Sequence, residues 1–111
     1  MTERNREQTP VVWVIQEGKN DYSSAENFGT VEFITDSDIT AFKVSNLNKQ
    51  SDFDIRKFLS KYIPDVDYII PSGNPMLVAK VIMSLPAGSH TLLKWDGRKG
   101  LYIPHNISPI K

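Results

Sequence analysis

A short turn between a predicted strand and a predicted helix is the best candidate in this sequence for a binding site. Ser72, Gly73 and Asn74 follow an apolar strand at 66–70, and Pro75 opens an apolar helix. Asparagine is a good N-cap, and proline at the first helical position loses no needed N–H group. A helix N-terminus attracts anions through free backbone N–H groups and its dipole. The pattern indicates either a phosphate or carboxylate site or a capped turn that only needs glycine.

A second candidate combines basic and aromatic side chains around a predicted β-turn. Glycines bracket the turn at 96–100, which joins predicted strands at 90–95 and 101–103. Basic residues interleaved with aromatic ones can bind single-stranded nucleic acid through phosphates and stacked bases. Neighbouring residues of a strand point to opposite faces, so the basic and aromatic side chains need not share one surface. The alternative is that the basic residues form a solvated hairpin tip. The residues of this candidate are Lys94, Trp95, Arg98, Lys99 and Tyr102, with a place in the core as the alternative for Trp95.

The third candidate is a polar loop that contains two aromatic residues. The segment 17–28 is about a dozen residues long, which is long enough to suggest a function. Tyr22 and Phe28 stand out in it as large apolar side chains. They either fold back onto the core or stand exposed as anchors for a partner, because aromatic side chains dominate contact energies at interfaces.

No arrangement of residues indicates catalysis or a bound cofactor. The chain has no cysteine, which excludes a disulfide framework, cysteine-ligated zinc and thiol chemistry. His90 and His105 lack a third metal ligand at a defined spacing, and Asp36 and Asp38 are not followed by the glycine and glutamate of a calcium loop. Ser72 lacks the Gly-x-Ser-x-Gly context of a nucleophile. We therefore expect no catalytic residue, no metal and no cofactor.

Composition places the chain among folded proteins of one domain. It has 111 residues, of which 40% are hydrophobic and 23% are charged, and these values are ordinary for one globular domain. No apolar run reaches the ~18 residues of a membrane-spanning helix. We expect a flexible leader at 1–10, a compact α/β domain at 11–107 and a tail at 108–111, in a cytoplasmic protein without a membrane partner.

Charge is unevenly distributed although the formal net charge is zero. Six acidic residues and one lysine lie between positions 17 and 38, whereas four basic residues and one aspartate lie between positions 89 and 111. These segments form either two solvated faces or two surfaces that attract each other between copies. We expect a protein partner or self-association, with a homodimer as the simplest assembly.

The apolar patterns predict an α/β fold, with α+β as the alternative. The continuous apolar segments 11–15 and 66–70 predict buried strands, and the alternating segment 30–34 predicts a half-buried one. A short edge strand could lie at 39–44. Hairpin-like strand pairs at both ends of the chain should be antiparallel, so we expect a mixed sheet of four to six strands with a C-terminal hairpin.

Two main helices are predicted. The first should begin with Ser51 as its N-cap, followed by one apolar stripe. The second, at 75–85, is apolar almost throughout, so it should be the most buried helix, with Val78 and Ile82 in the core. Strand, helix and strand within 66–95 should form one βαβ unit with parallel strands.

Several segments resemble one family. Residues 21–29 read Asp-Tyr-Ser-Ser-Ala-Glu-Asn-Phe-Gly, and residues 68–75 and 93–96 with the Tyr-Ile-Pro at 102–104 also match. Together they resemble small proteins of tailed bacteriophages and prophages, over roughly residues 11–104. The resemblance implies an accessory role in infection, in the bacterial cytoplasm. It carries across no catalytic residues and no assigned activity.

These observations favour a non-enzymatic, phage-related accessory protein that acts by binding a protein partner or itself. The alternative is a nucleic-acid-, nucleotide- or anion-binding protein that uses the 72–75 turn and the 94–102 hairpin. Salt-dependent retention on single-stranded DNA would separate the alternative from the first function, because phosphate contacts weaken as salt rises.

Overall fold

The computed structural model describes residues 9–18, 21–35 and 44–110, without the side chains of 44–49. Most of the expected leader, the greater part of the possible strand at 39–44, and Asp36 and Asp38 lie outside the described residues. Within the described ranges, no helix combines the length and apolar character needed to cross a membrane.

The centre of the fold is one five-stranded mixed sheet. Its strands are β1 (Val11–Gln16), β2 (Thr30–Thr35), β3 (Tyr68–Ile70), β4 (His90–Asp96) and β5 (Leu101–Ile107). They lie in the order β2-β1-β3-β4-β5, in which the first four are parallel and β5 is antiparallel to β4. The predictions of an α/β fold, a mixed sheet, a βαβ unit and a C-terminal hairpin are confirmed.

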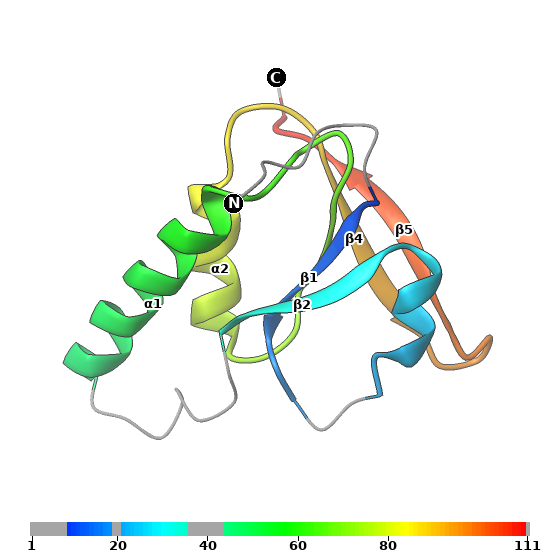
Figure 1. Cartoon of the computed structure of the whole chain (residues 1–111), viewed down its shortest axis with the longest axis horizontal. Coiled ribbons are helices and arrows are strands. Elements are labelled where there is room, and N and C mark those ends of the chain that lie inside the picture. The colour runs from blue at the N-terminus through cyan, green and yellow to red at the C-terminus, as the bar shows by residue number, and fades with distance from the viewer. Residues whose placement is uncertain (1–8, 19–20, 36–43, 111) are drawn as a thin grey trace.

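Two helices cover one face of this sheet, and a short 3-10 helix covers the other (Figure 1). The helices are α1 (Val44–Leu59) and α2 (Pro75–Ser84), and the 3-10 helix is η1 (Ser23–Asn27). Alternate residues of a strand project to opposite faces, so Trp13 and Ile15 of β1 pack towards α1 and α2, whereas Val12 and Val14 pack towards η1. All residues of β1 are buried, as a central strand with layers on both faces requires.

The expectation of an antiparallel strand pair at the N-terminal end was wrong. β1 and β2 are parallel, and Thr30 N–H donates to the carbonyl of Pro10, so β2 starts beside the start of β1. The segment that connects them crosses the sheet face as η1 and does not turn back as a hairpin. Parallel neighbours need such a crossover connection.

The expected boundaries of two elements were also wrong. α1 begins at Val44, and Ser51 lies inside it, buried and bonded to Lys80, whose ammonium donates to its hydroxyl at 3.1 Å. An interior serine is tolerated here because that hydrogen bond satisfies its oxygen. β5 continues through Pro104 to Ile107, since an edge strand can accommodate a proline that lacks the N–H group.

α2 is buried on one side only. Only Leu77 and Val81 of this helix are buried, whereas Val78 and Ile82 are half-buried. α2 lies on one face of the sheet beside α1, and the sheet can cover only one side of it. Its outer residues Met76 and Met83 are therefore exposed, despite their apolar character.

A buried carboxylate joins the start of β1 to the loop before β3. Asp67 is 2% exposed, and its two oxygens accept hydrogen bonds from Val11 N–H, the Trp13 indole N–H and Ile63 N–H, each at 3.0 Å. A buried charge is costly unless hydrogen bonds replace its water. These three donors make Asp67 the polar centre of the helix-side core.

Replacing Asp67 by Asn should lower the free energy of unfolding by about 3 kcal/mol or more. Hydrogen bonds to a charged acceptor contribute ~1.5–3 kcal/mol each. In the Asn variant, the side-chain NH₂ group would replace one carboxylate oxygen and face an N–H donor that it cannot accept from. Urea denaturation followed by circular dichroism measures this loss. The nearby exposed Asp65→Asn is the matched control and should cost less than about 1 kcal/mol. Equal losses for both variants would contradict the assignment.

Val81→Asp should prevent stable folding, because Val81 is fully buried and a buried unpaired charge costs several kcal/mol, against a total stability of ~5–15 kcal/mol. Val78→Asp and Ile82→Asp should cost less, since both sites are half-buried. Met83→Asp, on the exposed side, should cost least in dilute protein. Thermal melts rank the four variants, and a cooperative melt near wild type for Val81→Asp is the result that would refute this order.

Candidate functional site

The Ser72–Asn74 turn lies at the point where the strand order of the sheet reverses. β2 lies on one side of β1 and β3 on the other, and the turn follows directly on the carboxyl end of β3. Open α/β sheets tend to bind ligands beyond the carboxyl ends of strands at such a point. The structure therefore places the predicted turn where this class of fold commonly has its site.

The turn is held by Gln16, the last residue of β1. The backbone carbonyl of Gln16 accepts a hydrogen bond from the Ser72 hydroxyl at 2.9 Å, and its Oε1 accepts one from Asn74 N–H at 2.7 Å. The Asn74 side chain in turn accepts from Met76 N–H at 2.9 Å, and Pro75 has no N–H group. Side chains of the protein itself therefore satisfy two of the donors that an anion would use.

Gln16 is a residue of the site that the sequence analysis missed. Its side chain is buried, and its Nε2 has no hydrogen-bond partner among the described residues. Gly73 has φ of +104°, and a Cβ at this position would overlap the Gln16 side chain. The turn is thus fitted around Gln16, and anion binding at Ser72–Asn74 stays a prediction. The sequence signal that could have identified Gln16 was its position as a polar residue directly after the apolar segment 11–15.

Gly73→Ala should destabilise the protein more than Gly88→Ala does. Both glycines have positive φ, so both substitutions carry a backbone cost of ~1–2 kcal/mol, but a Cβ at Gly88 would meet nothing within 4 Å. The difference in unfolding free energy between the two variants measures the contact with Gln16. The double change Gly73→Ala with Gln16→Ser should cost less than the sum of the single changes. Equal costs for Gly73→Ala and Gly88→Ala would contradict this close fit.

The structure brings the second and third predicted sites together on the η1 face of the sheet. A cavity of about 430 Å³ lies between the start of the η1 segment and the β4–β5 hairpin. The residues that line it are Asp21, Ser23, Ser24, Trp95, Gly100 and Tyr102. The sequence separates these two groups by some seventy positions, so only the fold makes them neighbours.

Aromatic rings form one wall of this cavity. Trp95 is 48% exposed, and it meets the buried Tyr102 edge to face at a centroid distance of 5.1 Å. Tyr22 and Phe28, the two loop aromatics, pack onto the sheet instead of standing free. Tyr22 is buried and its hydroxyl accepts from the N–H of Gly18, and the Phe28 ring meets the ring of Tyr68.

The cavity also holds an ionised acceptor and a neutral hydroxyl. The backbone N–H and the hydroxyl of Ser23 lower the pKa of Asp21, which keeps the carboxylate charged at neutral pH. Burial raises the pKa of Tyr102, with Tyr22 and Asp21 adding to the effect, so the phenol of Tyr102 stays protonated. The cavity therefore combines a negative acceptor with a hydroxyl donor.

The basic residues of the hairpin divide between two places. Arg98 and Lys99 lie at the exposed tip, where the Asp96 carboxylate accepts hydrogen bonds from both of their backbone N–H groups. Lys94 and Trp95 point to opposite faces by strand alternation, and Trp95 lies on the cavity side. Lys94 is therefore not part of the cavity.

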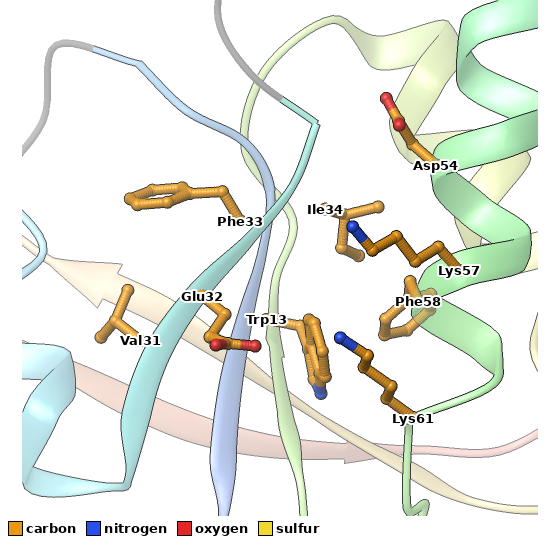
Figure 2. Close-up of a pocket in the computed structure, with 9 residues that line it drawn as sticks. All are labelled: Trp13, Val31, Glu32, Phe33, Ile34, Asp54, Lys57, Phe58 and Lys61. Carbon is orange, nitrogen blue, oxygen red and sulfur yellow. The ribbon is translucent and has the colours of Figure 1, made fainter. Parts of the chain in front are cut away.

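A second cavity, of about 450 Å³, lies between β2 and α1 (Figure 2). Lys57 of α1 and Lys61 of the turn after it reach towards the strand, and the ring of Phe58 lies beside them near Trp13. The carboxylates Glu32 and Asp54 also line this cavity, together with Val31, Phe33 and Ile34. Because charges of both signs alternate around it, the cavity does not favour a ligand of one charge.

His90 is fully engaged in the core. Its Nδ1 lies 2.6 Å from the hydroxyl of Tyr62, and its Nε2 lies 2.7 Å from the carbonyl of Pro86, which can only accept. Burial, aided by the charges of Asp67 and Asp65, raises the pKa of Tyr62, so its hydroxyl stays protonated. His90 thus bridges the segment after α1 and the segment after α2. No cluster of three possible metal ligands occurs among the described residues.

Comparison with protein families places the chain among phage proteins. The profile of the family described as phage Pam3 gp32-like protein matches residues 10–109. The chain belongs to this family. The predicted resemblance to small phage proteins is therefore confirmed, and the matched span includes the Ser72–Asn74 turn and the cavity of Trp95. Searches of curated proteins and of solved structures found no match.

Proposed function

We propose that this member of the phage Pam3 gp32-like family is an accessory protein that acts by binding protein through the outer face of α2. The observation that carries the proposal is the exposure of Met76 and Met83, which are 77% and 85% exposed. A helix that is apolar all round is normally buried. Here the sheet covers only one side of it, so the opposite side is left for a partner.

The exposed residues of α2 form one stripe. Met76, Ala79 and Met83 are spaced three and four positions apart, which places them on one side of a helix. Lys80, the one charged residue of α2, is directed to α1, where its ammonium pairs with Asp52 and donates to Ser51. The stripe therefore carries no charge of its own, and flexible methionine side chains adapt well to a partner surface.

A separate apolar cavity lies at the C-terminal end of α2. It measures about 290 Å³ and is formed where the end of the helix meets the end of β5. Its lining residues are Ile82, Leu85, Pro86, Ala87, Gly88, His90, Ile107, Ser108 and Pro109. The cavity adds apolar surface at the same helix as the stripe, and exposed apolar surface commonly marks an interaction site.

The occupant that we propose is a second copy of the chain. A chain with zero net charge does not repel its own copies over distance, and an apolar stripe is complementary to itself across a two-fold axis, the commonest symmetry of oligomers. The phage family supports the cytoplasm of the infected bacterium as the place of action.

Light scattering at ~10 and ~100 µM should give a mass above the 12.6 kDa of one chain that rises with concentration, as expected for a dimer of ~10⁻⁵ M dissociation constant. Met83→Glu and Met76→Glu should each return the mass to that of a monomer at both concentrations, because each buries a charge in the interface. The control Arg98→Glu with Lys99→Glu, on the hairpin tip, should leave the dimer intact.

Two results would count against this assembly. A monomer at both concentrations would refute the second copy as the occupant and leave a different protein as the partner of α2. A dimer that survives both methionine substitutions but is lost with the hairpin substitutions would move the interface from α2 to the hairpin.

A further inference from the structure

The cavity between the η1 segment and the hairpin carries two kinds of binding group, and a third kind lies next to it in the chain. Trp95 supplies a half-exposed aromatic ring, and Asp21 supplies an ionised carboxylate. Gly100 also lines the cavity, and it follows directly on Arg98 and Lys99, whose side chains are exposed. A ligand that fits must offer a flat apolar face, hydrogen-bond donors and a negative group.

The Trp95 ring is held in place before any ligand binds. Tyr102 supports it edge to face from within the sheet, and its indole nitrogen lies over the turn at Gly97, close enough to contact a Cβ there at 3.7 Å. A fixed ring loses little conformational freedom on binding. This arrangement suits stacking against a planar ring of the ligand.

The size of the cavity fits a small molecule. Its volume of about 430 Å³ lies within the range of ~300–1,000 Å³ typical of ligand sites. It opens on the η1 face, whereas the methionine stripe lies on α2 across the sheet. A ligand here therefore does not compete with the partner proposed above.

The charges around the cavity discriminate between ligand classes. A simple amine would suit Trp95 and Asp21, but the positive charges of Arg98 and Lys99, which directly precede the lining residue Gly100 in the chain, would disfavour it. A neutral sugar would leave both basic side chains unused. A nucleotide offers all three groups along one molecule: a planar base, the hydroxyl donors of its sugar and a phosphate. Carboxylates bind ribose hydroxyls in other nucleotide sites.

We infer that this cavity binds a ribonucleotide unit. The base stacks on Trp95, the ribose hydroxyls donate to the carboxylate of Asp21, and the phosphate pairs with Arg98 or Lys99. The unit can be a free mononucleotide or a nucleotide of single-stranded RNA, which share this chemistry. The inference goes beyond the proposed binding of protein and rests on a different face.

Titration of the ¹⁵N-labelled full chain with AMP, CMP, GMP and UMP, followed by NMR, tests the site directly. At about 5 mM, above the ~1 mM dissociation constant of a weak site, at least one nucleotide should shift the Trp95 indole resonance and the amides of Ser23, Ser24 and Gly100. Resonances of α2 should stay unchanged. The 2′-deoxy forms should bind several-fold more weakly, and a short uridine oligonucleotide tests the RNA source.

Four variants and one control, Lys94→Glu, assign the roles of the side chains. Trp95→Ala should weaken binding by about 10- to 100-fold, whereas Trp95→Phe should retain most of it. Asp21→Asn should reduce the preference for ribose over deoxyribose. Arg98→Glu should weaken nucleotides but not nucleosides. Lys94→Glu makes the same change of charge on the same hairpin, away from the cavity, and should leave binding unchanged.

The outcomes of these titrations either support or overturn the binding of a ribonucleotide unit in this cavity. Tighter binding of the oligonucleotide supports RNA as the source, and equal or weaker binding supports a free nucleotide. The inference is overturned if no nucleotide shifts the cavity resonances at about 5 mM, if Trp95→Ala binds like wild type, or if a sugar without a base binds as well as the nucleotides.

Discussion

The charge of Asp67 is the constraint on which the helix-side core depends. It is buried with three N–H donors that come from β1, from the indole of Trp13 and from the loop after α1. Strand, ring and loop therefore converge on one carboxylate. This convergence fixes where α1 ends relative to β1. Tyr62 directly precedes Ile63 in the loop after α1, and its hydroxyl bonds His90 at the start of β4.

The alternation of β1 then divides the molecule into two faces with different chemistry. One set of its side chains meets α1 and α2, and the other set meets η1 and the hairpin. On the helix side, α2 is left with an uncovered methionine stripe, a surface that suits another protein. On the η1 side, the loop and the hairpin enclose polar and aromatic groups, a surface that suits a small polar ligand. The two proposals are therefore compatible, because they use opposite sides of the same sheet.

Local patterns predicted the elements well and their surroundings less well. Asn74 and Pro75 begin α2 as expected, because capping acts within one helical turn. Ser51 failed as a cap because its hydroxyl is satisfied by Lys80 of the other helix, a contact that no local pattern contains. The apolar run of α2 correctly indicated a helix, but the depth of its burial depends on how many layers lie above it. Likewise, nothing within the strand patterns of β1 and β2 distinguishes a parallel pair from an antiparallel one.

The sequence by itself determined the fold class, most of the strands, both main helices and the glycine turn at Ser72–Asn74, because these depend on apolar periodicity and on capping between residues a few positions apart. It also identified the family, over residues 10–109. Only the tertiary structure decided that Gln16 holds that turn from 56 and 58 positions away, and that Asp21 and Trp95 line one cavity. The physical reason is that hydrogen bonds and cavities between distant segments exist only after strand order and crossover side are set, and these follow from packing of the whole sheet.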